Sequence, residues 1–192
     1  MKDNRIGILG GTFDPPHVGH LMIAKQVLEQ CRLDRIWFIP SAEPPHKKNS
    51  TITKGKDRIE MVKRAIVDED RFELCLLEFE RQGLSYTIDT VKELKRMYPT
   101  SHLYFIIGGD MVDSLHTWDR IDELLNEITF IAVKRPGSDF KSPYQDSLVQ
   151  VEFPTIDLSS TWIREQIKSG RTTDYYVTAE VRKYIEENLL YE

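Results

Sequence analysis

The sequence predicts a doubly wound α/β fold, in which a mostly parallel sheet carries helices on both faces and a small helical part follows. Three observations support this prediction. Short strands alternate with amphipathic helices along most of the chain. The strands are almost continuously apolar, which is typical of strands buried on both faces. Glycine pairs follow two of them, at Gly10-Gly11 and Gly108-Gly109, and open α/β sheets bind ligands beyond such strand ends.

The expected strands are short and rich in β-branched and aromatic residues. They cover residues 5–9, 35–39, 72–76, 103–107, 128–133 and 148–152. The helices are expected where apolar residues recur at helical spacing, as Ile88, Val91 and Leu94 do. They cover residues 18–31, 56–67, 88–97, 121–125, 161–168 and 178–188. Segments 40–55 and 135–147 collect prolines and polar residues and are expected to be loops.

Length and composition narrow the class of protein. With 192 residues, 40% apolar and 30% charged, the chain is expected to form a single domain, 1–192, with a C-terminal helical subregion at about 159–192. A net charge of −5 argues against a protein held to nucleic acid or anionic lipid by its overall field. No apolar stretch suits a signal peptide or a membrane span. Cys31 and Cys75 form no CxxC pair, so we expect reduced thiols in a cytoplasmic protein.

Residues Gly10–His20 form the first motif with chemical content. The glycines allow the backbone to approach a phosphate closely. The two prolines before Val18 suit the first turn of a helix, whose free amides and dipole favour an anion. His17 and His20 are three residues apart and share one helix face, where imidazoles suit charge developing on phosphate oxygens. Two other interpretations stay open, a metal-binding pair and a purely structural pair.

Residues Leu158–Arg164 form the second motif. Ser159 and Ser160 precede an amphipathic turn and are N-cap candidates. The same hydroxyls and amides can bind phosphate, and Arg164, one turn further on, can reach the same anion. Taken alone, this is an ordinary capping motif. Taken with the first motif, it predicts two helix starts on either side of one polyphosphate.

Both motifs resemble signatures of the (T/H)xGH nucleotidyltransferase superfamily. Gly10–His20 is similar to the (T/H)xGH signature itself, and Leu158–Arg164 is similar to the ISSTxxR motif, with leucine in place of isoleucine. Three more segments resemble the bacterial nicotinate-nucleotide adenylyltransferase family, and the resemblance as a whole spans nearly the whole chain, from Ile6 to Tyr191. These three segments are Pro44–Lys47, Ser85–Thr90, and Gly108–Asp110 followed by Trp118.

The resemblance implies a Rossmann-like fold and the transfer of AMP from ATP to nicotinate mononucleotide, a step of NAD biosynthesis. The products are deamido-NAD and pyrophosphate, and the cation implied is Mg²⁺. The acceptor's own phosphate would attack in line, so no covalent enzyme intermediate is expected. The cation would be held mainly by substrate phosphates and water rather than by a cage of protein ligands.

The resemblance also implies a set of site residues. The catalytic residues are His17, His20 and Arg164, which would hold the ATP phosphates and the departing pyrophosphate. The ATP site adds Gly10, Gly11, Thr12, Phe13, Gly108, Asp110, Ser159, Ser160 and Thr161. The nicotinate mononucleotide site comprises Lys47, Tyr86, Thr87, Trp118 and Arg135. Plainer interpretations remain: packing for Trp118, a solvated loop charge for Lys47, and helix N-caps for Thr87 and Asp110.

Two other functions fit part of the pattern. One is another small-molecule adenylyltransferase, such as one acting on phosphopantetheine, although those chains lack the segments around Ser85–Thr90 and Trp118. The other is a non-catalytic nucleotide-binding module, which would not need the histidine pair. Leu189, Leu190 and Tyr191 are expected to be exposed and suit docking either within the chain or between chains, so homo-oligomers stay open.

Overall fold

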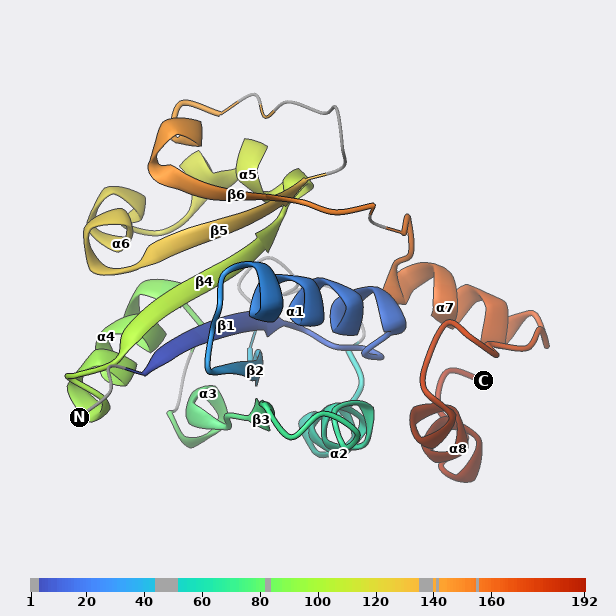
Figure 1. Ribbon diagram of the computed structural model, residues 1–192. Coiled ribbons are helices and arrows are strands. Elements are labelled where there is room, and N and C mark those ends of the chain that lie inside the picture. The colour runs from blue at the N-terminus through green and yellow to red at the C-terminus, as the bar shows by residue number, and fades with distance from the viewer. Residues whose placement is uncertain (1–3, 44–51, 82–83, 135–139, 141, 155) are drawn as a thin grey trace.

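A six-stranded sheet, in which every pair of neighbours is parallel, forms the centre of the protein (Figure 1). The computed structural model describes residues 4–43, 52–81, 84–134, 140, 142–154 and 156–192. The strands are β1 (Arg5–Gly11), β2 (Arg35–Pro40), β3 (Phe72–Leu74), β4 (His102–Gly108), β5 (Thr129–Lys134) and β6 (Leu148–Glu152). The predicted α/β fold class is confirmed.

The strand order places a switch point at the middle of the sheet. The order is β3-β2-β1-β4-β5-β6, so the chain winds outward from β1 in one direction and from β4 in the other. β1 and β4 are direct neighbours, with Ile6 opposite Leu103 and Ile8 opposite Phe105. Ligands of doubly wound sheets bind beyond the carboxyl ends of the strands at this point. Both glycine pairs of the sequence lie there.

Eight α-helices are assigned within the described residues, two more than the sequence predicts. They are α1 (Val18–Gln30), α2 (Gly55–Ala65), α3 (Leu77–Glu80), α4 (Thr87–Met97), α5 (Gly109–Asp113), α6 (Ile121–Glu127), α7 (Ser160–Lys168) and α8 (Ala179–Glu187). α3 and α5 are too short for a helical period to show in the sequence. The expected strand 72–76 ends at Leu74, because Leu76 already caps α3.

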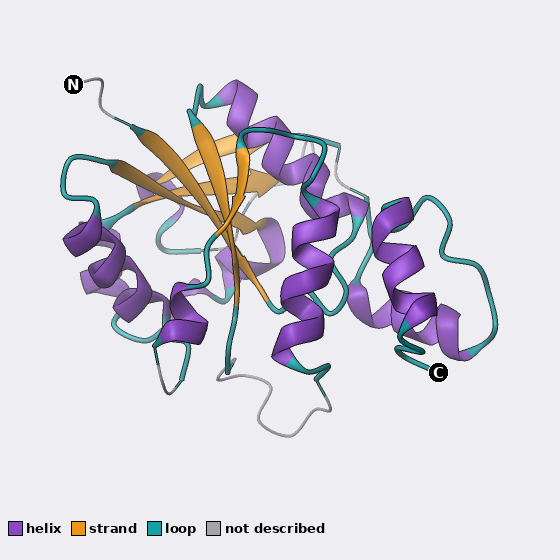
Figure 2. Ribbon diagram, turned by 90° about the horizontal axis from the view of Figure 1, so that it is seen from below, coloured by secondary structure: helices purple, strands orange, loops and turns teal. Residues whose placement is uncertain are grey.

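Helices flank both faces of the sheet (Figures 1 and 2), and the hydrophobic core forms one layer on each face. α1 and α2 cover one face, where Leu28 and Phe38 are fully buried, and apolar residues of α7 and α8 extend the same core layer. α3, α4, α5 and α6 cover the other face, where Ile39 and Val91 are buried. Adjacent strand residues such as Phe38 and Ile39 point into opposite layers, which is the period-two geometry of a strand.

The helical part after β6 stands beside the sheet (Figure 2). α8 packs on α2. Leu190 and Tyr191 pack within the chain against the first core layer, whereas Leu189 is 68% exposed. None of the helices in the described ranges is both long and apolar enough to cross a membrane.

Candidate active site

Residues 12–17 form the short loop that joins β1 to α1 and carries the first motif. In this loop Phe13 has a φ of 51°, and its side chain is only 2% exposed. A Cβ on Gly11 would lie 3.1 Å from the Phe13 ring, so a side chain at position 11 would force the ring to move. The buried Phe13 side chain therefore packs beneath the loop in the protein interior, and only the backbone of Phe13 can contact a nucleotide.

His17 and His20 lie together at the start of α1. Their rings are stacked, with centroids 3.6 Å apart and planes inclined by 25°. His20 Nδ1 accepts a hydrogen bond from the backbone N–H of His17 at 3.1 Å. In the neutral ring of His20 the proton consequently lies on Nε2. A Cβ on Gly19 would lie 3.0 Å from His17 Nδ1, so this glycine makes room for the ring.

Burial keeps both imidazoles neutral. It lowers the pKa of His17 to about 4. Burial, together with the neighbouring His17, also holds the pKa of His20 well below its usual value. Among the described residues, the buried His17 Nδ1 has no hydrogen-bond partner. Each neutral ring offers one N–H donor, and an anion placed beside the pair would raise both pKa values.

The second motif lies directly against this loop. Ser159 caps α7, its hydroxyl accepting from the backbone N–H of Trp162 at 3.2 Å. Ser160 Oγ donates to the carbonyl of Pro15 at 2.8 Å. Arg164 Nη1 donates to the carbonyl of Asp14 at 2.7 Å, across 150 positions of sequence. The fold thus brings the guanidinium to the loop that ends at the histidine pair, as two helix starts around one polyphosphate require.

Thr161 contributes differently from the serines. Its Oγ1 accepts from Arg164 Nη2 at 3.2 Å and so helps to orient the guanidinium. Ser160 already donates its hydroxyl proton within the protein, whereas Ser159 only accepts from Trp162. An anion at this helix start could therefore accept from the Ser159 O–H as well as from backbone N–H groups and Arg164.

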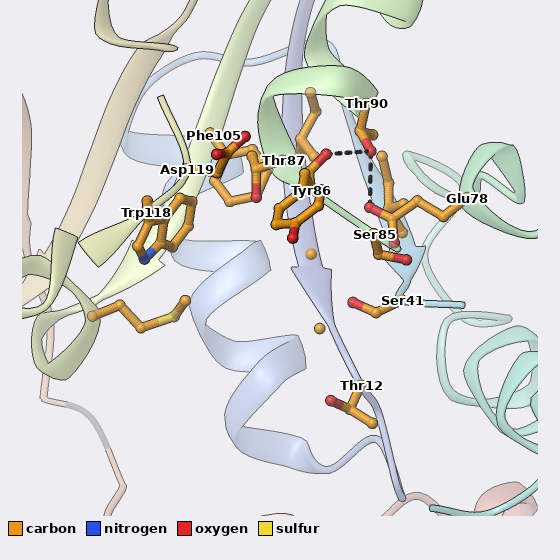
Figure 3. A pocket seen from close by; sticks show the side chains of 15 residues that line it. Thr12, Ser41, Glu78, Ser85, Tyr86, Thr87, Thr90, Phe105, Trp118 and Asp119 are labelled. Atoms are coloured by element: carbon orange, nitrogen blue, oxygen red, sulfur yellow. Dashed lines mark hydrogen bonds between the residues drawn. The ribbon is translucent and has the colours of Figure 1, made fainter. Parts of the chain in front are cut away.

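A cavity of about 270 Å³ opens at the carboxyl ends of β1, β2 and β4. Gly10, Gly11 and Thr12 line it on the side of the first motif. Tyr86, Thr87 and Trp118 line the opposite side (Figure 3). The cavity is therefore continuous with the glycine loop, as the site for two substrates that react with each other has to be.

Trp118 and Thr87 both line this cavity. The Trp118 ring meets Phe105 and Phe130 edge-on, at centroid distances of 5.7 and 5.9 Å. Packing and cavity lining thus coexist in one side chain. The N-cap of α4 is Tyr86, with no side-chain cap bond, and Thr87 is the first helical residue. The interpretation of Thr87 as the N-cap is wrong, and its side chain is left to face the cavity (Figure 3).

Four expected residues give less structural information. Lys47 and Arg135 lie outside the described residues. Gly108 caps α5, and a Cβ there would meet nothing within 4 Å, so the strand end beside it is open. Asp110 is the second residue of α5, so the N-cap interpretation of this residue is also wrong.

Arg58 is a central residue that the sequence reasoning missed. It is 2% exposed, and its guanidinium donates to the carbonyls of Thr12 at 2.9 Å and Ser41 at 2.8 Å. It also donates to the carbonyls of Thr53 at 3.0 Å and Ala42 at 3.3 Å. Burial lowers its pKa. Arg58 therefore ties the glycine loop to the segment after β2, and both of these segments reach the cavity.

A buried polar network behind Tyr86 was also missed. Thr90 Oγ1 donates to Glu78 Oε1 at 3.0 Å and lies 3.3 Å from the carbonyl of Tyr86 (Figure 3). Ser85 Oγ accepts from the backbone N–H groups of Ala42 and Glu43 at 3.1 and 3.2 Å. Burial raises the pKa of Glu78. The network holds the Ser85–Thr87 segment in place along the cavity wall.

The described residues contain no group of three or more His, Cys, Asp or Glu side chains that could hold a metal ion. A zinc-type site on the histidine pair would need a third protein ligand. A divalent cation at this place would instead take oxygen ligands from a bound substrate and from water.

Comparison with known proteins identifies the family of the chain. The family model described as cytidylyltransferase-like matches residues 8–166. Nicotinate-nucleotide adenylyltransferase of Bacillus subtilis (strain 168) is 53% identical over 188 residues, which cover 98% of this chain and 98% of that protein. The chain belongs to the nicotinate-nucleotide adenylyltransferase family.

The fold is also that of two solved structures of Plasmodium falciparum nicotinic acid mononucleotide adenylyltransferase. One is complexed with APC and is 20% identical, and the other is complexed with NaAD and is 21% identical. Each has a TM-score of 0.80 and covers 98% of this chain and 97% of its own. At this level of identity the likeness concerns the fold, which is Rossmann-like as expected.

Proposed function

We propose that the protein transfers AMP from ATP to nicotinate mononucleotide, with deamido-NAD and pyrophosphate as products, as a step of NAD biosynthesis in the cytoplasm. Membership of the family supports this function. The single structural observation behind it is the hydrogen bond from Arg164 to the carbonyl of Asp14. This bond joins the two motifs at one loop, next to a cavity large enough for a nucleotide ring.

In this proposal, the residues around the glycine loop handle the triphosphate. A phosphate oxygen of nicotinate mononucleotide attacks the α-phosphorus of ATP, and the bond from that phosphorus to the bridging oxygen of the β-phosphate breaks. His17 and His20 each donate an N–H to phosphate oxygens as negative charge shifts toward the leaving group. Arg164 and the amides at the start of α7 hold the departing pyrophosphate. No protein nucleophile takes part.

The far side of the cavity handles the acceptor. The Trp118 ring offers an apolar stacking face to the pyridine. Thr87 and the backbone N–H groups at the start of α4 suit the nicotinate carboxylate, because the first turn of a helix leaves its amides free. Lys47 and Arg135 stay in the proposal as ligands of the acceptor phosphate, and Gly108 and Asp110 as neighbours of the ATP ribose.

Mg²⁺ is proposed to enter with the triphosphate. When bound, it would neutralise charge on the phosphate oxygens while keeping most of its water ligands. His17, His20 and Arg164 supply N–H donors, and the Asp14 carboxylate of the loop already accepts from Tyr191 and Thr53. This arrangement suits a ligand whose own oxygens hold the metal.

Release of pyrophosphate from Mg·ATP tests the function directly. Nicotinate mononucleotide, its amide analogue and phosphopantetheine are offered as acceptors in parallel. We expect the fastest release with nicotinate mononucleotide. Faster release with phosphopantetheine would assign the protein to the other adenylyltransferase activity, and no release with any acceptor would refute the enzymatic function.

A matched pair of variants tests the role of Arg164. Arg164→Met should lower kcat by about 10²–10³, the usual cost of losing one donor to a transition state. Arg171→Met removes the same charge just after α7, where the Arg171 guanidinium donates to Gln166, and should change kcat less than about twofold. Equal losses in both variants would show that Arg164 acts only through general charge.

A further inference from the structure

Tyr191, in the segment that follows α8, reaches the loop between β1 and α1. Its hydroxyl donates to Asp14 Oδ1 at 2.7 Å, across 177 positions of sequence. The same hydroxyl lies 3.8 Å from Met61 Sδ, and the ring is partly buried against the first core layer. Asp14 itself is only 4% exposed. Tyr191 thus supplies a hydrogen bond to a buried carboxylate within the first motif.

Asp14 is the point at which three distant segments meet. Its Oδ1 accepts from Tyr191, and its Oδ2 accepts from the backbone N–H of Thr53 at 3.2 Å. Its backbone carbonyl accepts from Arg164 Nη1 at 2.7 Å. Two hydrogen bonds therefore fix the orientation of the Asp14 carboxylate. In this orientation Arg164 bonds to the backbone carbonyl of Asp14 rather than to its carboxylate. His17 follows three residues later in the same loop.

We propose that Tyr191 is a positioning residue for AMP transfer, whose hydroxyl acts through Asp14 to fix the loop carrying His17 and to keep Arg164 available to the triphosphate. This inference rests on the proposed function. Without the hydroxyl, Asp14 Oδ1 is a buried acceptor with no donor, a costly state for a carboxylate. The Asp14 carboxylate can then find a new donor by turning toward the Arg164 guanidinium, which already bonds to the Asp14 carbonyl. It then competes with the phosphates for Arg164 and moves the loop.

The chain offers a closely matched control in Tyr184. This residue lies on α8, and its hydroxyl donates to Asp57 Oδ1 on α2 at 2.9 Å. Asp57 is 8% exposed, so its carboxylate is also buried. Tyr184→Phe and Tyr191→Phe each remove one hydroxyl from one buried aspartate and keep the ring. Only the second change touches the loop of the first motif.

The experiment compares both variants with the wild type in pyrophosphate release, with Mg·ATP and nicotinate mononucleotide varied separately. Melting temperatures are measured for all proteins, and assays are run well below the lowest midpoint. Tyr191→Phe should lower kcat/KM for ATP by about tenfold, as expected for one lost hydrogen bond to a charged group, with KM for nicotinate mononucleotide unchanged within about twofold. Tyr184→Phe should change all constants less than about twofold. A Tyr191→Phe enzyme within about twofold of wild type, or equal losses in both variants, would overturn the proposal.

A double-mutant cycle with Asp14→Ala tests the route of the effect. If the hydroxyl acts through Asp14, adding Tyr191→Phe to Asp14→Ala should lower kcat/KM for ATP by less than about twofold. Full additivity would overturn the proposal. Should the wild type reject nicotinate mononucleotide, the proposed function fails, and the affinity of the same variants for Mg·ATP, measured by calorimetry, still decides the role of Tyr191: a loss confined to Tyr191→Phe supports it, and unchanged affinity refutes it.

Discussion

The depressed pKa of His17 predicts that this residue contributes to destabilisation of the protein by acid. Burial lowers its pKa from 6.5 to about 4 in the folded chain, so between these values the unfolded chain binds the proton more readily. The stability that depends on a neutral His17 is complete above about pH 6.5 and is lost as the pH falls toward 4. The whole difference corresponds to about 3 kcal/mol, of which about 2 kcal/mol is lost by pH 5.

Urea denaturation at about pH 8 and about pH 5 measures this loss in the wild type and in His17→Asn, whose side chain does not titrate. The wild type should lose about 2 kcal/mol more of its free energy of unfolding than the variant between the two pH values. His20 acts in the same direction in both proteins, because burial also lowers its pKa. Equal losses in the two proteins would refute the claim that the folded structure holds His17 neutral.

Four more predictions address individual side chains. His17→Ala should lower kcat by about 10²–10³ in the pyrophosphate assay, and unchanged turnover would remove His17 from the mechanism. Trp118→Ala should raise KM for nicotinate mononucleotide about tenfold with little change in kcat. A lower kcat with an unchanged KM would contradict stacking of the Trp118 ring on the pyridine. Arg58→Met should lower the free energy of unfolding, measured by urea denaturation, by about 3–5 kcal/mol, against less than about 1 kcal/mol for Arg64→Met on the same helix. A loss for Arg58→Met as small as that for Arg64→Met would show that the buried guanidinium is dispensable. Burial raises the pKa of Glu78, so the folded protein loses stability as the pH rises through that pKa and the side chain ionises. Glu78→Gln should therefore have a higher melting temperature than the wild type at about pH 8, and the difference should be smaller at about pH 4. A difference that does not change with pH would contradict this.

Most of the fold follows from patterns that are local in sequence. Apolar runs such as 103–107 predict buried parallel strands, and the regular spacing of Ile88, Val91 and Leu94 predicts α4. The failures come from short elements, since α3 spans only Leu77–Glu80 and shows no period. The order of the strands is a property of long-range packing that no local pattern records.

The candidate site can be predicted from the sequence only where the residue types and their spacing indicate a particular chemistry. His17, His20 and Arg164 stand in distinctive motifs, and the fold brings the two motifs into contact. The position of Arg58 could have been recognised in the sequence, because Arg58 lies on the buried face of α2 with Met61. A buried arginine needs hydrogen-bond acceptors for its guanidinium. Tyr191 gives no such indication, because a tyrosine among apolar residues is ordinary until a partner such as Asp14 comes within hydrogen-bond distance of it.

The bond between Arg164 and the carbonyl of Asp14 also bears on how the enzyme is made. A ribosome releases the glycine loop and both histidines early in translation, whereas α7 emerges only after another 150 residues. A nascent chain that has folded its first strands therefore presents the loop without its guanidinium. With the role proposed for Arg164, AMP transfer from ATP requires that nearly all of this sequence has left the exit tunnel, so a half-synthesised chain would not consume the nucleotide.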